Sequence, residues 1–131
     1  MIISDLLLSH NLPRTLARWT PTGASGEIRV PLANEYIQEG SVDIYLNGVT
    51  PVDQVILIDD RISTGGTLVS LVQAIRQSGA AILEIFTIGE KSENRGREHL
   101  LQETGFTVKT LLRTSLARTG DKVFSKVDRV H

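Results

Sequence analysis

The amino-acid sequence predicts a single α/β domain, in which a parallel sheet carries flanking helices. The first observation is a continuous apolar run at residues 55–58, which is typical of a strand buried on both faces of a parallel sheet. The second is a helical repeat after that strand, with apolar side chains three or four positions apart at Leu68, Leu71, Val72 and Ile75. The third is the alternation of strand and helix patterns over residues 54–112, which indicates βαβ units with right-handed crossovers.

The length of 131 residues fits one domain, residues 1–131, with an expected core over about residues 12–112 and a polar tail over residues 119–131. Hydrophobic residues make up 40% and charged residues 22%, which excludes a disordered, collagen-like or coiled-coil chain. Fourteen basic residues nearly balance fifteen acidic ones, so no overall positive field exists to attract nucleic acid or an anionic membrane. We therefore expect small-molecule partners, with no nucleic acid and no membrane.

The absence of cysteine excludes disulfide scaffolds, thiolate zinc sites and cysteine nucleophiles. The longest apolar runs have four residues, which is far too short to cross a bilayer. The N-terminal sequence MIISD lacks a basic region and does not resemble a secretory signal, so the expected location is the cytoplasm. The three histidines, His10, His99 and His131, share no metal-ligand spacing and are expected on the surface.

The first elements of the chain are expected to be short. Residues 2–9 predict a helix that ends before Pro13, because the residue preceding a proline avoids the helical region. A strand is expected at residues 15–19, and the turn residues at 20–26 predict a loop.

Two half-buried strands are expected next. Apolar and polar residues alternate at 28–32 and again at 42–46, which is the pattern of strands with one face in the core. The pair Asn47-Gly48 follows and is a strong turn signal.

The second half of the chain predicts the helices and the remaining strands. The helix that contains Leu68 should end at Gly79, because glycine readily adopts the left-handed conformation found at helix C-termini. The patterns that follow predict a strand at residues 82–88, a helix at 95–104 that Gly105 ends, and a strand at 106–112. Apolar residues at helical spacing in the tail predict one or two docked helical turns, at Val123, Phe124, Val127 and Val130.

The loop between the apolar strand and the first of these helices carries the residues best suited to chemistry. It consists of glycines and hydroxyl residues: Ser63, Thr64, Gly65, Gly66 and Thr67. Its backbone N–H groups lie at a helix N-terminus, where unpaired donors and the helix dipole favour an anion. The glycines let the backbone close around that anion without obstruction from side chains. We therefore expect a phosphate-binding loop.

Asp59 and Asp60 lie at the end of the apolar strand, where open α/β sheets bind their ligands. Two carboxylates beside a phosphate would repel it unless they face sugar hydroxyls or a divalent cation. The acids and the loop together therefore predict a phosphorylated sugar with a metal ion nearby.

Two other phosphate-binding loops do not fit this segment. It lacks the lysine of a Walker loop, and the spacing of Gly65 and Gly66 differs from the dinucleotide-binding fingerprint. A purely structural alternative is a tight strand-to-helix turn whose helix is capped by Ser63 or Thr64. The apolar strand and the acid pair that precede the glycines favour the binding site over this alternative.

Residues 55–67, VILIDDRISTGGT, resemble the signature with which type I phosphoribosyltransferases bind 5-phosphoribosyl 1-diphosphate. The resemblance implies a Rossmann-like parallel sheet with flanking helices, shortened at its N-terminal side. It also implies that residues 63–67 hold the 5-phosphate, and that Asp59 and Asp60 face the ribose 2- and 3-hydroxyls near the Mg²⁺ carried by the diphosphate. Arg61 departs from the pattern, since the family usually has an aliphatic residue at this position.

The resemblance extends to both sides of the signature. Glu35-Tyr36 is similar to the pair on the mobile loop of adenine phosphoribosyltransferases, which implies that Glu35 assists proton removal from the purine. The segment LARW at 16–19 is similar to a strand end that supplies a basic contact to the diphosphate, so Arg18 is the candidate. The segment IGEK resembles the purine side of 6-oxopurine enzymes, which implies that Lys91 bonds the 6-oxo group. The choice between adenine and a 6-oxopurine stays open.

The implied reaction transfers the phosphoribosyl group to a purine base and releases diphosphate, as in nucleotide salvage. Positive charge develops on the ribose in the transition state, where Asp59 and Asp60 would stabilise it. Mg²⁺, the implied cofactor, and Arg18 would neutralise the departing diphosphate. The resemblance also implies a homodimer.

Only eleven residues precede Leu12, too few for the strand and diphosphate-binding loop that family members have before this point. That strand would lie beside residues 55–58, so its absence predicts an exposed strand edge. Three hypotheses therefore stand: a purine phosphoribosyltransferase, a noncatalytic phosphoribosyl- or nucleotide-binding regulator or truncated homologue, and an unrelated doubly wound domain that binds another phosphate.

Overall fold

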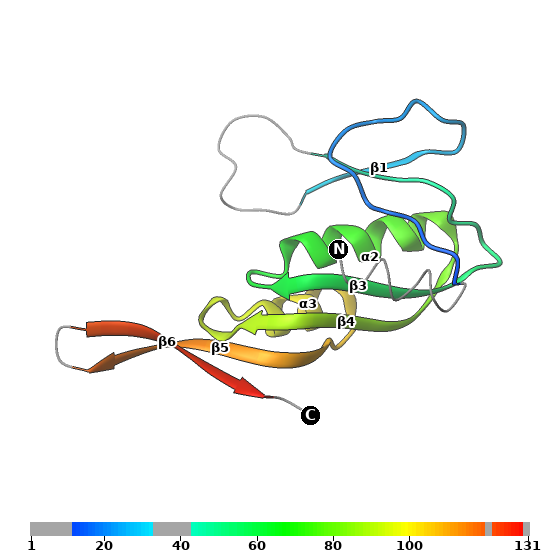
Figure 1. Ribbon diagram of the computed structural model, residues 1–131. Helices are drawn as coiled ribbons and strands as arrows, with labels where there is room; N and C mark the ends of the chain where they lie inside the picture. Colours follow the sequence, from blue (N-terminus) through cyan, green and yellow to red (C-terminus); the bar gives the residue numbers. More distant parts are fainter. Residues whose placement is uncertain (1–11, 33–42, 120–121, 130–131) are drawn as a thin grey trace.

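The computed structural model describes residues 12–32, 43–119 and 122–129 (Figure 1). Its larger sheet has the strand order β3 (Gln54–Ile62), β4 (Ala81–Lys91), β5 (Lys109–Thr119) and β6 (Lys122–Arg129). The first three of these strands are parallel, and β6 pairs antiparallel with β5. The connections are α2 (Gly66–Ser78) between β3 and β4, and η1 (Ser92–Asn94) with α3 (Gly96–Thr104) between β4 and β5. The predicted βαβ arrangement is confirmed.

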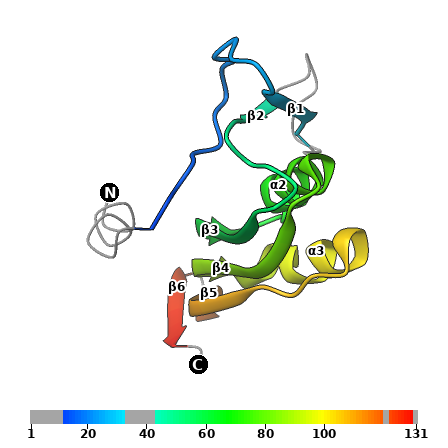
Figure 2. The same cartoon turned by 90° about the vertical axis from the view of Figure 1, so that its right-hand side faces the viewer.

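Both helices cover the same face of this sheet (Figure 2). A small antiparallel sheet of β1 (Ile28–Pro31) and β2 (Asp43–Leu46) packs against α2 on the side away from the larger sheet. The Ser70 hydroxyl on α2 donates a hydrogen bond of 3.1 Å to the carbonyl of Pro31, which ties the helix to β1. Within the described residues, no helix is long and apolar enough to span a membrane.

The hydrophobic core fills the space between these layers, and α2 supplies much of it. Its buried residues include the four expected from the helical repeat: Leu68, Leu71, Val72 and Ile75. The helix ends at Gly79, which has a φ of 85° and donates its N–H to the carbonyl of Arg76. Gly105 ends α3 in the same left-handed conformation, so both predicted helix stops are confirmed.

The expected burial of residues 55–58 on both faces is wrong. Successive side chains on a strand point to opposite faces, and Leu57, on the helix-covered face, is only 6% exposed, whereas Ile56 on the other face is 58% exposed. Among the described residues β3 forms an edge of the sheet, as expected, and no described helix covers the outer face. That face exposes further apolar side chains at Ile58, Ile88 and Leu111.

Three further expectations need correction. Residues 15–19 form no strand, because only Arg18 pairs with β2, through two backbone hydrogen bonds with Tyr45. The strand expected at 106–112 begins at Lys109 and continues to Thr119. The tail forms β6 in place of helical turns, because Val123 and Val127 lie four residues apart and this spacing suits both a helix and one face of a strand. The helix expected at 2–9 lies outside the described residues.

Candidate functional site

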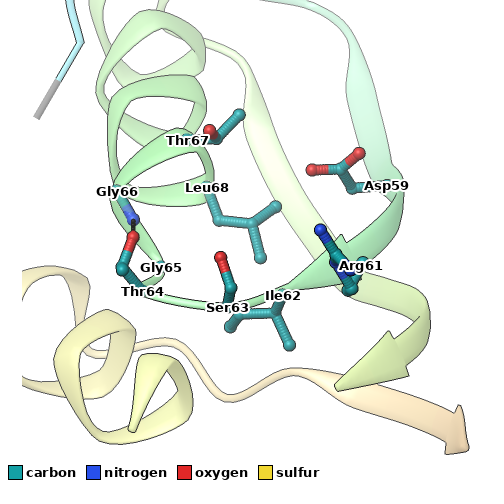
Figure 3. Close-up of a pocket in the computed structure, with 9 residues that line it drawn as sticks. All are labelled: Asp59, Arg61, Ile62, Ser63, Thr64, Gly65, Gly66, Thr67 and Leu68. Carbon is teal, nitrogen blue, oxygen red and sulfur yellow. Dashed lines mark hydrogen bonds between the residues drawn. The ribbon is translucent and has the colours of Figure 1, made fainter. Parts of the chain in front are cut away.

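A small hollow lies where β3 ends and α2 begins (Figure 3). Every residue of the stretch 59–68 except Asp60 lines it: Asp59, Arg61, Ile62, Ser63, Thr64, Gly65, Gly66, Thr67 and Leu68. The structure therefore brings the predicted phosphate loop together with Asp59. This place, at the carboxyl end of a parallel strand, is where open α/β sheets bind ligands.

The loop enters α2 through Gly65, which has a φ of 85°. Neither Ser63 nor Thr64 occupies the N-cap, so that part of the structural alternative is wrong, and the Thr64 hydroxyl accepts only a long hydrogen bond of 3.4 Å from the Gly66 N–H. The first turn of α2 contains no acidic residue. Its N–H groups and the helix dipole therefore give the end of the hollow a partial positive charge that suits an anion.

The loop also packs closely against the start of α3. A Cβ atom on Gly65 would lie 2.7 Å from the carbonyl oxygen of Gly96, and a Cβ on Gly96 would overlap the carbonyl oxygen of Ser63. The Nδ1 atom of His99 lies 2.8 Å from the carbonyl oxygen of Thr64. The sequence predicted that His99 is an ordinary surface residue. This prediction is wrong, because His99 contacts the loop.

The sequence did carry a signal for this contact. Gly96 and His99 are three positions apart in the helix expected at 95–104, so they share one face of it. What the sequence does not contain is the partner of that face, because Thr64 lies 35 positions away along the chain.

Asp59 and Asp60 differ in their surroundings. Asp59 is half-buried and lines the hollow, whereas Asp60 is exposed and does not. The Asp59 carboxylate accepts a hydrogen bond of 2.9 Å from the Asp60 N–H. Burial raises the pKa of Asp59 above its ordinary value; the Asp60 N–H opposes this shift, and the Asp60 carboxylate adds to it by repulsion. Pairing of β3 continues to Ile62, so the acids lie within the strand and not after its end.

Proteins of similar sequence are purine phosphoribosyltransferases. The hypoxanthine/guanine phosphoribosyltransferase of Methanocaldococcus infernus is 33% identical over 112 residues, which cover 86% of this chain and 58% of that protein. The enzyme of the same name from Methanopyrus kandleri is 34% identical over 122 residues, which cover 93% of this chain and 60% of that protein. The chain thus spans less than two thirds of the length of these relatives. No family model matches it.

Solved structures of similar fold are adenine phosphoribosyltransferases. The enzyme from Rhodothermus marinus has a TM-score of 0.71 and 23% identity, with 86% of this chain and 62% of that chain covered. The enzyme from Trypanosoma brucei, solved with AMP, pyrophosphate and ribose-5-phosphate, has a TM-score of 0.67 and 27% identity, with coverage of 78% and 44%.

The chain is thus a homologue of these hypoxanthine/guanine phosphoribosyltransferases and has the type I phosphoribosyltransferase fold. This assignment overturns the hypothesis of an unrelated doubly wound domain. It also confirms the fold that the signature implied, a parallel sheet with flanking helices.

Lys91, the candidate for the purine, lies at the end of β4 and is half-buried. It pairs in register with Thr114 and does not line the hollow. The neighbouring Glu90 is buried and accepts two hydrogen bonds from Arg97, at 3.2 and 2.9 Å. Burial would raise the pKa of Glu90, but the hydrogen bonds and charges of Arg97 and Arg113 outweigh it, so the pKa lies below its ordinary value. Glu90 is therefore engaged within the protein.

The other candidates of the family pattern lie away from the hollow or outside the described residues. Arg18 is exposed beside β2, held by the backbone bridge to Tyr45, and does not line the hollow. Glu35 falls outside the described residues. Arg61 does line the hollow, and no ion pair within the described part of the chain includes it.

Metal ligands are sparse in the described ranges. No group of three or more His, Cys, Asp or Glu side chains there could hold a metal ion. Asp59 and Asp60 offer carboxylate oxygens, the type of ligand that Mg²⁺ takes, but two side chains leave most of its octahedral shell to water or to substrate oxygens. These residues fit an ion that arrives with its substrate.

Proposed function

We propose that this chain binds 5-phosphoribosyl 1-diphosphate together with Mg²⁺ and transfers the phosphoribosyl group to a purine base, releasing diphosphate. The observation that carries the proposal is that one hollow joins a half-buried acid, Asp59, to a glycine-rich loop at a helix N-terminus. The names of the sequence relatives support a purine as acceptor. The ligands in the Trypanosoma brucei structure support a ribose 5-phosphate in this type of fold.

The loop would hold the 5-phosphate. The N–H groups that follow Ser63 and the hydroxyls of Thr64 and Thr67 surround the place where an anion is favoured. Binding at the 5-phosphate fixes the far end of the substrate, so that the reacting carbon of the ribose is positioned before the base arrives.

Asp59 would face the ribose hydroxyls. A half-buried carboxylate acts at lower dielectric than a solvated one, so it stabilises positive charge on the sugar ring more strongly. The exposed Asp60 would contact the Mg²⁺–diphosphate part of the substrate through water. The ion itself would supply charge neutralisation of the leaving group.

Arg61 and Arg18 are the candidate cations for the leaving diphosphate. Arg61 lines the hollow, and Arg18 lies on the exposed segment beside β2. Lys91 at the end of β4 is the candidate for the 6-oxo group of the purine, and Glu35 for removal of its proton. The sequence relatives favour a 6-oxopurine as the acceptor. We also expect a homodimer, which size-exclusion chromatography with light scattering measures directly.

The decisive experiment has two stages. The chain is first titrated with 5-phosphoribosyl 1-diphosphate and Mg²⁺ in a calorimeter, and then incubated with adenine, hypoxanthine, guanine or xanthine while released diphosphate is measured. We expect binding, and release with at least one 6-oxopurine. The control is the Asp59→Asn, Asp60→Asn double variant, in which release should fall below detection while the fold is retained.

The two stages separate the alternatives. Binding without release with every base, at high protein concentration, would support the noncatalytic regulator. Absence of binding would overturn both readings.

A further inference from the structure

Two peptide groups of the phosphate loop turn their carbonyl oxygens toward α3. His99 Nδ1 lies 2.8 Å from the carbonyl oxygen of Thr64, and because a carbonyl only accepts, the imidazole donates. The preceding carbonyl, that of Ser63, lies so close to Gly96 that any side chain there would collide with it. The start of α3 therefore faces two consecutive carbonyl groups of the loop.

These two contacts fix where the N–H groups of the loop point. Every peptide bond in the described residues is trans, and in a trans peptide the C=O and N–H of one unit point in opposite directions. The N–H groups that share peptides with these carbonyls belong to Thr64 and Gly65, so both point away from α3. Figure 3 shows α3, the helix drawn in yellow, on the side of the loop away from Asp59 and Thr67. The two N–H groups thus point toward the hollow that Thr64 and Gly65 line.

The peptide between Thr64 and Gly65 needs such an anchor. Gly65 has a φ of 85°, and glycine exchanges between left- and right-handed conformations at little cost, so this peptide can rotate unless one end is held. Within the described residues, neither Thr64 nor Gly65 donates its N–H to another backbone group. His99 supplies the hold from outside the loop, and its hydrogen bond keeps the Gly65 N–H available to an anion.

We propose that His99 is a positioning residue of the phosphate loop, which acts through the Thr64 carbonyl and raises the affinity for the phosphoryl group of the ligand. This inference rests on the proposed function in one respect, that the ligand is a ribose 5-phosphate. The physical reason is preorganisation: a loop that is ordered before binding loses less conformational entropy when the phosphate arrives.

The test compares variants that differ in a donor at this position. His99→Leu removes the donor, and His99→Asn places an amide N–H near the position of Nδ1. Gln102→Leu, at an exposed position of α3, is the matched control. The readouts are the Kd for ribose 5-phosphate and for inorganic phosphate by calorimetry, and the ¹⁵N amide resonance of Gly65 in the ligand-free protein.

We expect His99→Leu to weaken ribose 5-phosphate binding by about 5- to 10-fold, the effect of one lost hydrogen bond. The Gly65 resonance should shift in this variant, while His99→Asn recovers most of the affinity and Gln102→Leu changes nothing. His99→Ala is a second variant without a donor, for use if His99→Leu does not fold.

Unchanged affinity in both donor-free variants would overturn the inference, and so would equal losses in His99→Leu and His99→Asn with the Gly65 resonance in place. If the variants show the expected pattern but the wild-type chain releases no diphosphate with any purine, the result supports the inference and refutes the proposed transfer reaction. A wild-type chain that binds no ribose 5-phosphate would overturn both.

Discussion

The carbonyl oxygen of Gly96 lies where only a glycine at position 65 leaves room for it: a Cβ on Gly65 would be 2.7 Å away. Gly65 precedes α2 and Gly96 begins α3, so the two helices of the sheet meet backbone to backbone at the phosphate loop. The start of α3 therefore supports the loop, which also lines the hollow at the end of β3.

Alanine at Gly65 should be far more destabilising than alanine at Gly105, although both glycines have nearly the same positive φ, 85° and 80°. The left-handed conformation costs both variants about 1–2 kcal/mol. Only Gly65→Ala also meets neighbouring backbone, since nothing lies within 4 Å of a Cβ on Gly105. We expect an additional loss of about 1–3 kcal/mol in the free energy of unfolding, measured by urea denaturation. Equal losses of unfolding free energy in Gly65→Ala and Gly105→Ala would mean that the starts of α2 and α3 are not in contact in solution.

Local signals in the sequence accounted for the helices of the sheet and for the loop. The glycines at 79 and 105 ended the two helices where expected, because the left-handed C-terminal conformation depends on the residue itself. The loop between β3 and α2 could also be placed from the sequence, since a strand, an acid pair and glycines before a helix lie in one stretch of chain.

What the sequence missed depended on distant partners or on ambiguous spacing. The contact of His99 with Thr64 exists only after α3 packs beside the loop. The tail forms β6 because it pairs with the edge of β5, and residue spacing alone does not reveal that such a partner is present. The different surroundings of Asp59 and Asp60, in contrast, could have been predicted from the sequence, because adjacent residues of a strand point to opposite faces.

Arg61 is predicted to contribute to anion binding through its charge. It lines the hollow, and the family usually has an aliphatic residue there, so Arg61→Ile is a natural exchange. We expect about 2- to 3-fold weaker binding of ribose 5-phosphate at low ionic strength, with the difference fading above about 0.5 M salt as the charge is screened. Arg129→Ile, an exposed position on β6, removes the same charge outside the hollow and should leave the Kd unchanged. A loss that persists at high salt would point to a direct contact and not to long-range attraction.

Neighbouring residues of β3 should respond very differently to truncation. Leu57 is 6% exposed and packs in the core, so Leu57→Ala should cost about 2–4 kcal/mol of unfolding free energy. Ile56 is 58% exposed on the outer face, and Ile56→Ala should cost less than about 1 kcal/mol. Chemical denaturation of the two variants measures both values. A large loss for Ile56→Ala would show that a further segment or a second copy covers this face in solution.

Asp59 is predicted to lower the stability of the fold at neutral pH. Because burial raises the pKa of its carboxyl above the value in the unfolded chain, the folded state binds the proton more tightly. The free energy of unfolding therefore falls as the pH rises from the pKa of Asp59 in the unfolded chain to its higher pKa in the folded chain. Above the folded pKa it stays at this lower value. Asp59→Asn carries no charge and keeps an oxygen that can accept the hydrogen bond of the Asp60 N–H.

Asp59→Asn should therefore have a higher Tm than the wild-type chain at pH 7, by roughly 1–4 °C, and the same Tm near pH 3, where the carboxyl is protonated in both states. Its affinity for ribose 5-phosphate should move the other way, falling about 10-fold as the charged acceptor for the ribose hydroxyls is lost. Thermal unfolding across this pH range and calorimetry at pH 7 measure the two effects. A higher Tm together with a weaker affinity in Asp59→Asn would show that Asp59 serves ligand binding at a cost in stability. A lower Tm at pH 7 would instead mean that its charge has a stabilising partner in the folded chain.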